Sequence, residues 1–137
     1  MQTVPQRLAA LRAAMKRAGC DFYILPSSDP HSSEYAPAHY TAWEYFSGFS
    51  FENSNLIVAS DEAAMWVDGR FFGAADAALA NTGIASMHMG GKGVPTAEQW
   101  LEQKLSSGSV LGYCAETMPV LQMRRLADVC RKKDAVL

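Results

Sequence analysis

Residues 56–72 read L-I-V-A-S-D-E-A-A-M-W-V-D-G-R-F-F, and this stretch decides the fold. Two apolar runs, 56–59 and 63–67, flank the polar residues 60–62, which predicts two strands joined in an antiparallel hairpin. Asp68 and Gly69 are turn formers, so the second strand is expected to end at this point. A helix rich in small alanines is predicted to follow over 71–79.

Helical and strand-like patterns alternate on both sides of this hairpin. In the first helix Leu8, Leu11 and Met15 recur at three- and four-residue steps. A later helix begins with a capping box, in which Thr96 and Gln99 satisfy each other's backbone amides. The other expected elements are helices over 5–18, 38–46, from 96 onward and 120–132, strands over 22–25, 85–89 and 110–113, and the beginning of a strand at 135–137. Alternation with one hairpin predicts a single α/β domain over 1–137, a three-layer mixed β-sheet flanked by helices.

Composition and charge exclude several classes of protein. The formal net charge of -2 argues against a nucleic-acid surface, which needs a basic face. No run approaches the roughly 18 apolar residues of a membrane span, and basic residues interrupt the amino-terminal stretch where a signal peptide would be apolar. Three widely spaced cysteines form no disulfide framework or C-x-x-C site, which predicts a reducing, cytoplasmic setting.

No complete catalytic constellation is visible in the sequence. His31 and Glu34 could lie close together, but two ligands are too few for a metal site. The segment around Ser50 begins like a G-x-S-x-G nucleophile elbow but ends in Glu52. Residues 90–93, G-G-K-G, lack the phosphate-loop pattern and are expected to form a flexible connection. We therefore predict no catalytic and no metal-binding residues in this chain.

Three segments are candidates for binding. Arg70, just after the Asp-Gly turn, carries five donors in a planar fork that can clamp a carboxylate or a peptide carbonyl. The alternative is an intramolecular pair with Asp68, Asp76 or a helix end. Residues 27–35 are very polar and either are solvated or line a polar cleft. Residues 43–51 are rich in aromatics, most expected in the core and one or two at an interface.

The sequence resembles the amino-terminal domain of the Xaa-Pro aminopeptidases (aminopeptidase P), in the creatinase and prolidase superfamily. The stretches that carry the resemblance run along nearly the whole chain: R-L-A-A-L-R-A-A-M at 7–15, D-F-Y-I-L-P-S-S-D-P-H-S-S-E-Y at 21–35, F-S-G-F at 46–49, A-M-W-V-D-G-R-F-F at 64–72 and M-G-G-K-G-V-P-T-A-E-Q-W-L at 89–101. Two segments depart from the family pattern: residues 50–55 are bulkier than its Gly-rich turn, and Tyr113-Cys114 replaces a Val-Asp pair.

The resemblance implies a fold similar to ribonuclease H in outline, and a separation of catalytic and accessory roles between two domains. In the family, a carboxy-terminal "pita-bread" domain holds two divalent metals, often Mn or Zn, which generate a hydroxide and polarise the scissile carbonyl. That domain is absent from this chain, and the strand-like residues 135–137 lead us to expect an excised domain. In the family, the amino-terminal domain covers the mouth of the active site, limits access to short or unstructured peptides and joins in oligomer contacts.

The resemblance also implies candidate substrate contacts. Arg70 matches a family arginine that can approach bound peptide, and weaker candidates for the rim are His31, Glu34 and the 49–53 loop, with Phe49 and Glu52. The expected partners are the chain's own carboxy-terminal catalytic domain, proline-containing peptides and further copies in a homo-oligomer, with no nucleic acid and no membrane. Two other functions stay open from the residues: a protein-interaction module that acts alone, and a small hydrolase that uses Ser50 or His31.

Overall fold

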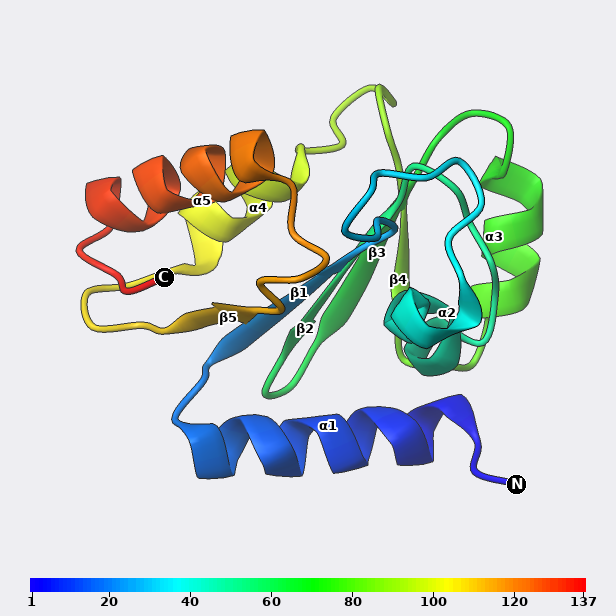
Figure 1. Ribbon diagram of the computed structural model, residues 1–137, viewed down its shortest axis with the longest axis horizontal. Helices are drawn as coiled ribbons and strands as arrows, with labels where there is room; N and C mark the ends of the chain where they lie inside the picture. The colour runs from blue at the N-terminus through cyan, green and yellow to red at the C-terminus, as the bar shows by residue number, and fades with distance from the viewer.

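The computed structural model describes all residues from 1 to 137 and shows a central sheet with helices on both faces (Figure 1). The strands are β1 (Phe22–Pro26), β2 (Asn55–Ala59), β3 (Ala63–Val67), β4 (Ala85–His88) and β5 (Leu111–Tyr113). The helices are α1 (Val4–Ala18), the short 3-10 helix η1 (Ala38–Tyr40), α2 (Ala42–Ser47), α3 (Phe72–Leu79), α4 (Ala97–Lys104) and α5 (Val120–Lys132). The expected three-layer α/β architecture is confirmed.

The sheet is mixed, with strand order β4-β3-β2-β1-β5. The hairpin predicted from residues 56–67 is present, with Leu56 opposite Met65 and Ile57 opposite Ala64 in an antiparallel register. β2 is also antiparallel to β1, whereas β5 and β4 run parallel to their neighbours. Four strands therefore point in one direction, and β2 alone runs against them.

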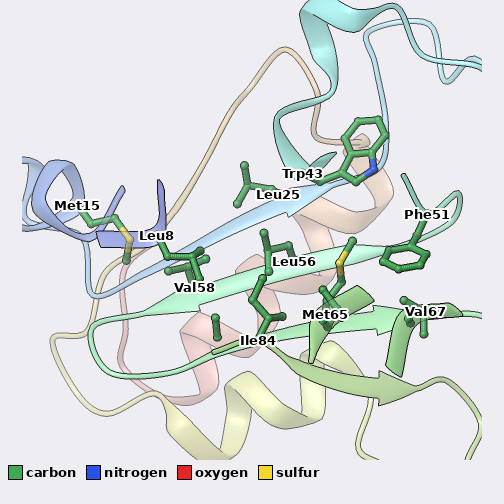
Figure 2. Close-up of a cluster of buried hydrophobic side chains, with 13 residues drawn as sticks. Leu8, Met15, Leu25, Trp43, Phe51, Leu56, Val58, Met65, Val67 and Ile84 are labelled. Carbon is green, nitrogen blue, oxygen red and sulfur yellow. The ribbon is translucent and has the colours of Figure 1, made fainter. Parts of the chain in front are cut away.

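Alternation along the strands sends side chains into two separate cores. Leu56, Val58 and Met65 pack on one face with residues of α1, α2 and α3 (Figure 2). Ile57 and Trp66 point to the opposite face, where α4 and α5 cover the sheet. Every residue of β3 is buried. Burial on both faces explains why this strand reads as a continuous apolar run instead of an alternating one.

Local capping chemistry sets the helix ends. The expected capping box of α4 is present, with Gln99 N–H donating to Thr96 Oγ1 at 3.1 Å. α1 has a second capping box, made by Thr3 and Gln6. Gly19 ends α1 with a φ of 74°, a left-handed conformation that glycine adopts without strain.

Two segments differ in detail from the expected elements. Residues 38–46 form no single helix, because Thr41, with φ -95° and ψ 45°, interrupts the helical path between η1 and α2. At the carboxyl end, Val136 makes one isolated parallel bridge with Val110 instead of a full strand. No helix of the chain has both the length and the apolar character that a bilayer span needs.

The two-sided core predicts a large difference between two leucine substitutions. Leu56→Ala leaves a cavity at a side chain that is 0% exposed and should lower the free energy of unfolding by about 2–5 kcal/mol. Leu121→Ala, at a residue of α5 that is 67% exposed, should change it by less than about 0.5 kcal/mol. Urea unfolding of both variants measures the difference, and equal losses would contradict this account of the core.

Candidate functional site

One edge of the sheet collects the loops that carry the candidate residues. The four codirectional strands end together at this edge, and the antiparallel β2 begins there. The loop after β1 (27–35), the turn after β3 (68–71) and the segment before β2 (48–54) therefore meet (Figure 1). In open α/β sheets, ligands bind outside the carboxyl ends of the strands, so this edge is where a site is expected.

Arg70 is held at this edge by the turn that ends β3. The Asp68 carboxylate accepts hydrogen bonds from the Arg70 backbone N–H at 3.0 Å, from Nε at 3.1 Å and from Nη2 at 2.8 Å. These bonds from Arg70 hold the pKa of Asp68 below its usual range. The guanidinium is thus oriented by a residue two positions away, while 62% of its side chain stays exposed.

Glu52 reaches the same guanidinium from the segment before β2. Its Oε2 lies 3.4 Å from Arg70 Nη1. The two side chains stand in the wall of a hollow of about 420 Å³, which we call the edge hollow. Its lining consists of Ser27, Ser33, Glu34, Tyr35, Ala36, Trp43, Glu44, Ser50, Glu52, Asn53 and Arg70. Polar and charged side chains predominate, so the hollow suits a polar ligand.

The loop after β1 is held in place by hydrogen bonds on its buried side, and its other side faces solvent. Asp29 is buried and accepts the backbone N–H groups of His31 at 3.0 Å and Ser33 at 2.8 Å. These backbone hydrogen bonds, chiefly the one from Ser33, lower the pKa of Asp29. Ser27 Oγ accepts the Ser54 N–H at 2.7 Å, which ties the loop to the beginning of β2. The loop therefore both faces solvent and lines a polar hollow.

Trp43 forms an apolar part of the wall and carries an unpaired donor. The residue is 5% exposed and belongs to the buried hydrophobic cluster shown in Figure 2, and its indole N–H has no acceptor. Leaving a buried donor unpaired costs about 1–3 kcal/mol. Nearby, Ser50 Oγ donates to Glu44 Oε1 at 2.5 Å. This bond engages the Ser50 hydroxyl with a carboxylate, so the structure shows no Ser–His pair at this position.

The structure brings together three of the five residues predicted to contact substrate. Arg70, Glu34 and Glu52 line the edge hollow. Phe49 lies in the wall of a neighbouring depression and stacks on Phe51, with ring centroids 4.1 Å apart. His31 is exposed and does not line the edge hollow. Of the intramolecular pairs considered for Arg70, the one with Asp68 forms, whereas Asp76 instead pairs with His88 at 2.8 Å.

Trp43 and Glu44 are lining residues that the sequence did not single out as ligand contacts. The only signal for Trp43 was its place in an aromatic-rich segment, which is equally typical of a core residue. No three His, Cys, Asp or Glu side chains lie close enough together to hold a metal ion. The residues present thus do not fit a divalent metal, and the arrangement can bind and orient a ligand.

Comparison with known proteins identifies relatives along almost the whole chain. The family model for the creatinase/prolidase N-terminal domain matches residues 7–136. The "Probable Xaa-Pro aminopeptidase P" of Botryotinia fuckeliana is 36% identical over 128 residues, covering 93% of this chain and 19% of the relative. Aminopeptidase P2 of Arabidopsis thaliana is 34% identical over 133 residues, covering 96% of this chain and 19% of the relative. The chain thus spans about a fifth of the length of these relatives.

Solved structures agree with this assignment. The X-prolyl aminopeptidase of Caenorhabditis elegans, described as a cytosolic enzyme with a di-nuclear active site, superposes with a TM-score of 0.90 at 28% identity, over 99% of this chain and 24% of that chain. The N-terminal domain of the cytoplasmic peptidase PepQ from Mycobacterium tuberculosis H37Rv superposes with a TM-score of 0.66 at 23% identity, over 96% of this chain and 89% of that one. The second likeness concerns the fold alone.

The Asp68–Arg70 pair predicts a specific acid titration. We expect the Asp68 carboxyl to titrate with a midpoint below the ordinary 3.8, followed by NMR of its side-chain carbon. Since the folded-state pKa lies below the unfolded one, the pair stabilises the fold above about pH 4 and loses that contribution as the pH falls through the folded value.

Two matched variants test whether Arg70, and not a general effect of acid, lowers the titration midpoint of Asp68. Arg70→Ala should raise the Asp68 midpoint towards its ordinary value, whereas Arg124→Ala, at an exposed residue of α5, should leave it unchanged. An Asp68 midpoint that is the same with and without Arg70 would show that the pair does not form in solution.

Proposed function

This chain belongs to the creatinase/prolidase N-terminal domain family, and from that membership we propose that it is the non-catalytic, substrate-contacting domain of a metal-dependent Xaa-Pro aminopeptidase. Residues 1–137 act as one domain, and hydrolysis of the Xaa-Pro bond belongs to a carboxy-terminal part of a longer, cytoplasmic protein. The observation that carries the proposal is the family match over 7–136, in a chain that spans about a fifth of its aminopeptidase relatives.

The chemistry in this proposal is divided between two parts of the protein. Two divalent metals, Mn or Zn, bound in the catalytic part supply the hydroxide and polarise the scissile carbonyl. Arg70 cannot act as an acid or base, because a guanidinium stays protonated at any physiological pH. It can donate to a peptide carbonyl or carboxylate, and its exposure and its fixed orientation on Asp68 suit that role.

The edge hollow gives the domain a means of limiting access to the catalytic centre. A domain that stands over the mouth of an active site admits peptides that its own surface can accommodate, and polar walls favour extended chains with free backbone groups. We place Arg70, Glu34 and Glu52 at this rim and Phe49 beside it. Contacts between copies in a homo-oligomer belong to the same proposal. His31, which is exposed and outside the hollow, stays at most a peripheral contact.

The experiment is steady-state kinetics of the full-length protein with a Xaa-Pro peptide. Arg70→Ala should raise KM at least about threefold with a smaller effect on kcat, because it removes a contact that binds the peptide. The expected increase is modest because the guanidinium is exposed and is already paired with Asp68. Arg131→Ala is the matched control, since Arg131 is also exposed and paired with an aspartate, Asp128, at 2.7 Å on α5. An unchanged KM for Arg70→Ala removes Arg70 from the substrate path.

A further inference from the structure

We propose that a crevice outside the carboxyl ends of β1 and β5 binds a small aromatic molecule that carries no negative charge. This crevice, which we call the β1–β5 crevice, has a volume of about 310 Å³. Its lining consists of Leu11, Tyr23, Ile24, Leu25, Pro26, His39, Tyr40, Ala42, Phe46, Cys114, Glu116 and Thr117. None of these residues lines the edge hollow, so the inference goes beyond the proposed function and does not rest on it.

The topology of the sheet explains why a crevice lies at this position. β1 and β5 are neighbouring parallel strands. The chain leaves β1 towards α2, which packs on one face of the sheet, and leaves β5 towards α5, which packs on the opposite face (Figure 1). Adjacent parallel strands whose connections diverge in this way form a topological switch point, and ligands of open α/β sheets bind in the crevice outside it. The lining agrees with this rule, since most of it comes from β1, η1, α2 and residues 114–117.

Gly112 of β5 allows an aromatic wall to form in the crevice. It lies opposite Tyr23 in the parallel register of β5 and β1. A Cβ atom at position 112 would lie only 2.8 Å from Tyr23 Cδ2 and 2.8 Å from Cys20 Sγ. The Tyr23 ring therefore lies over β5 in space that any larger residue would occupy. Burial raises the pKa of the Tyr23 hydroxyl, with a smaller contribution from the Cys114 thiol, which places this partly buried ring near Cys114.

The chemistry of the lining favours an aromatic ligand without negative charge. Four of the lining side chains are rings, those of Tyr23, His39, Tyr40 and Phe46. A further ring packs well against such walls in edge-to-face or offset geometry. An apolar cavity of about 150 Å³ is enough for benzene, so the crevice has room for one substituted ring. No arginine or lysine lines it, and its one carboxylate belongs to Glu116, so an anion would find no fixed counter-charge.

The first test is an NMR titration of the 137-residue chain with three probes that share one ring, at about pH 8, where an ordinary histidine is neutral. The probes are 4-ethylphenol, which is neutral, tyramine, which is cationic, and 3-(4-hydroxyphenyl)propionate, which is anionic. We expect the first two to give saturable shifts of the backbone amide signals of residues 114–117, with a Kd of about 1 mM for a molecule of this size. The anionic probe should bind at least about twofold more weakly, because Glu116 repels it.

The reactivity of the three thiols locates the bound probe. Cys114 is exposed and lines the crevice, Cys20 lines a different hollow, and Cys130 is buried. At a concentration above its Kd, 4-ethylphenol occupies more than half of the sites and should slow alkylation of Cys114 by iodoacetamide at least about twofold. Alkylation of Cys20 should be unchanged. Mass spectrometry of the digested protein measures each cysteine separately.

Matched variants assign binding to the crevice. Ala42→Trp places a bulky ring in the crevice from α2 and should abolish the saturable shifts, whereas Ala14→Trp, at an exposed residue of α1 outside the crevice, should bind as the unaltered chain does. If the NMR spectrum shows that Ala42→Trp does not fold, Cys114→Phe makes the same test from the opposite wall, at an exposed residue. Glu116→Gln should reduce the difference between the anionic and the neutral probe.

Four results would overturn the inference. They are shifts that rise linearly with probe concentration and never saturate, equal affinities for the anionic and neutral probes, equal protection of Cys20 and Cys114, and unchanged binding by a folded variant with the crevice filled. None of them bears on the proposed function, which is tested through the effect of Arg70→Ala on KM. The two proposals therefore fail independently.

Discussion

The burial of β3 on both faces is the constraint on which the rest of the structure depends. Met65 lies in the core under α1, α2 and α3, and its neighbour Trp66 lies in the core under α4 and α5. A shift of one residue in register would exchange these two faces, so the pairing with β2 and β4 is strongly specified. Because Val67 is the last buried residue of the strand, the Asp68–Arg70 turn must emerge at the carboxyl edge of the sheet.

This constraint also explains how distant segments come to line one polar hollow at the carboxyl edge of the sheet. Asp68 orients Arg70 through a contact between near neighbours, so the guanidinium is positioned as soon as the turn forms. Glu52 and the loop after β1 reach the same place by long-range folding, because β2 begins where β1 ends. The result is a preformed polar hollow lined by hydrogen-bond donors and acceptors, in which the Ser50 hydroxyl donates to the Glu44 carboxylate.

The features that the sequence predicted are those encoded locally. The hairpin, the end of β3 and the capping box at Thr96 depend on residues close together in the chain, and all are present. The box at Thr3 has the same pattern and was recognisable, yet it was not predicted. The division of residues 38–46 follows from the backbone of Thr41, for which the residue type gave no signal. Long-range partners were also beyond the sequence: the pairing of Arg70 with Glu52 and the unpaired indole of Trp43 both depend on how distant segments meet.

The central claim is that these residues shape and contact a substrate whose bond is cleaved elsewhere. The most direct test is an assay of the purified 137-residue chain for release of the amino-terminal residue from a Xaa-Pro peptide, with Mn²⁺ or Zn²⁺ added, beside the full-length protein in the same buffer. The account predicts turnover by the full-length protein and none above the peptide-only blank for the chain alone. Metal-dependent cleavage by the isolated chain would contradict it.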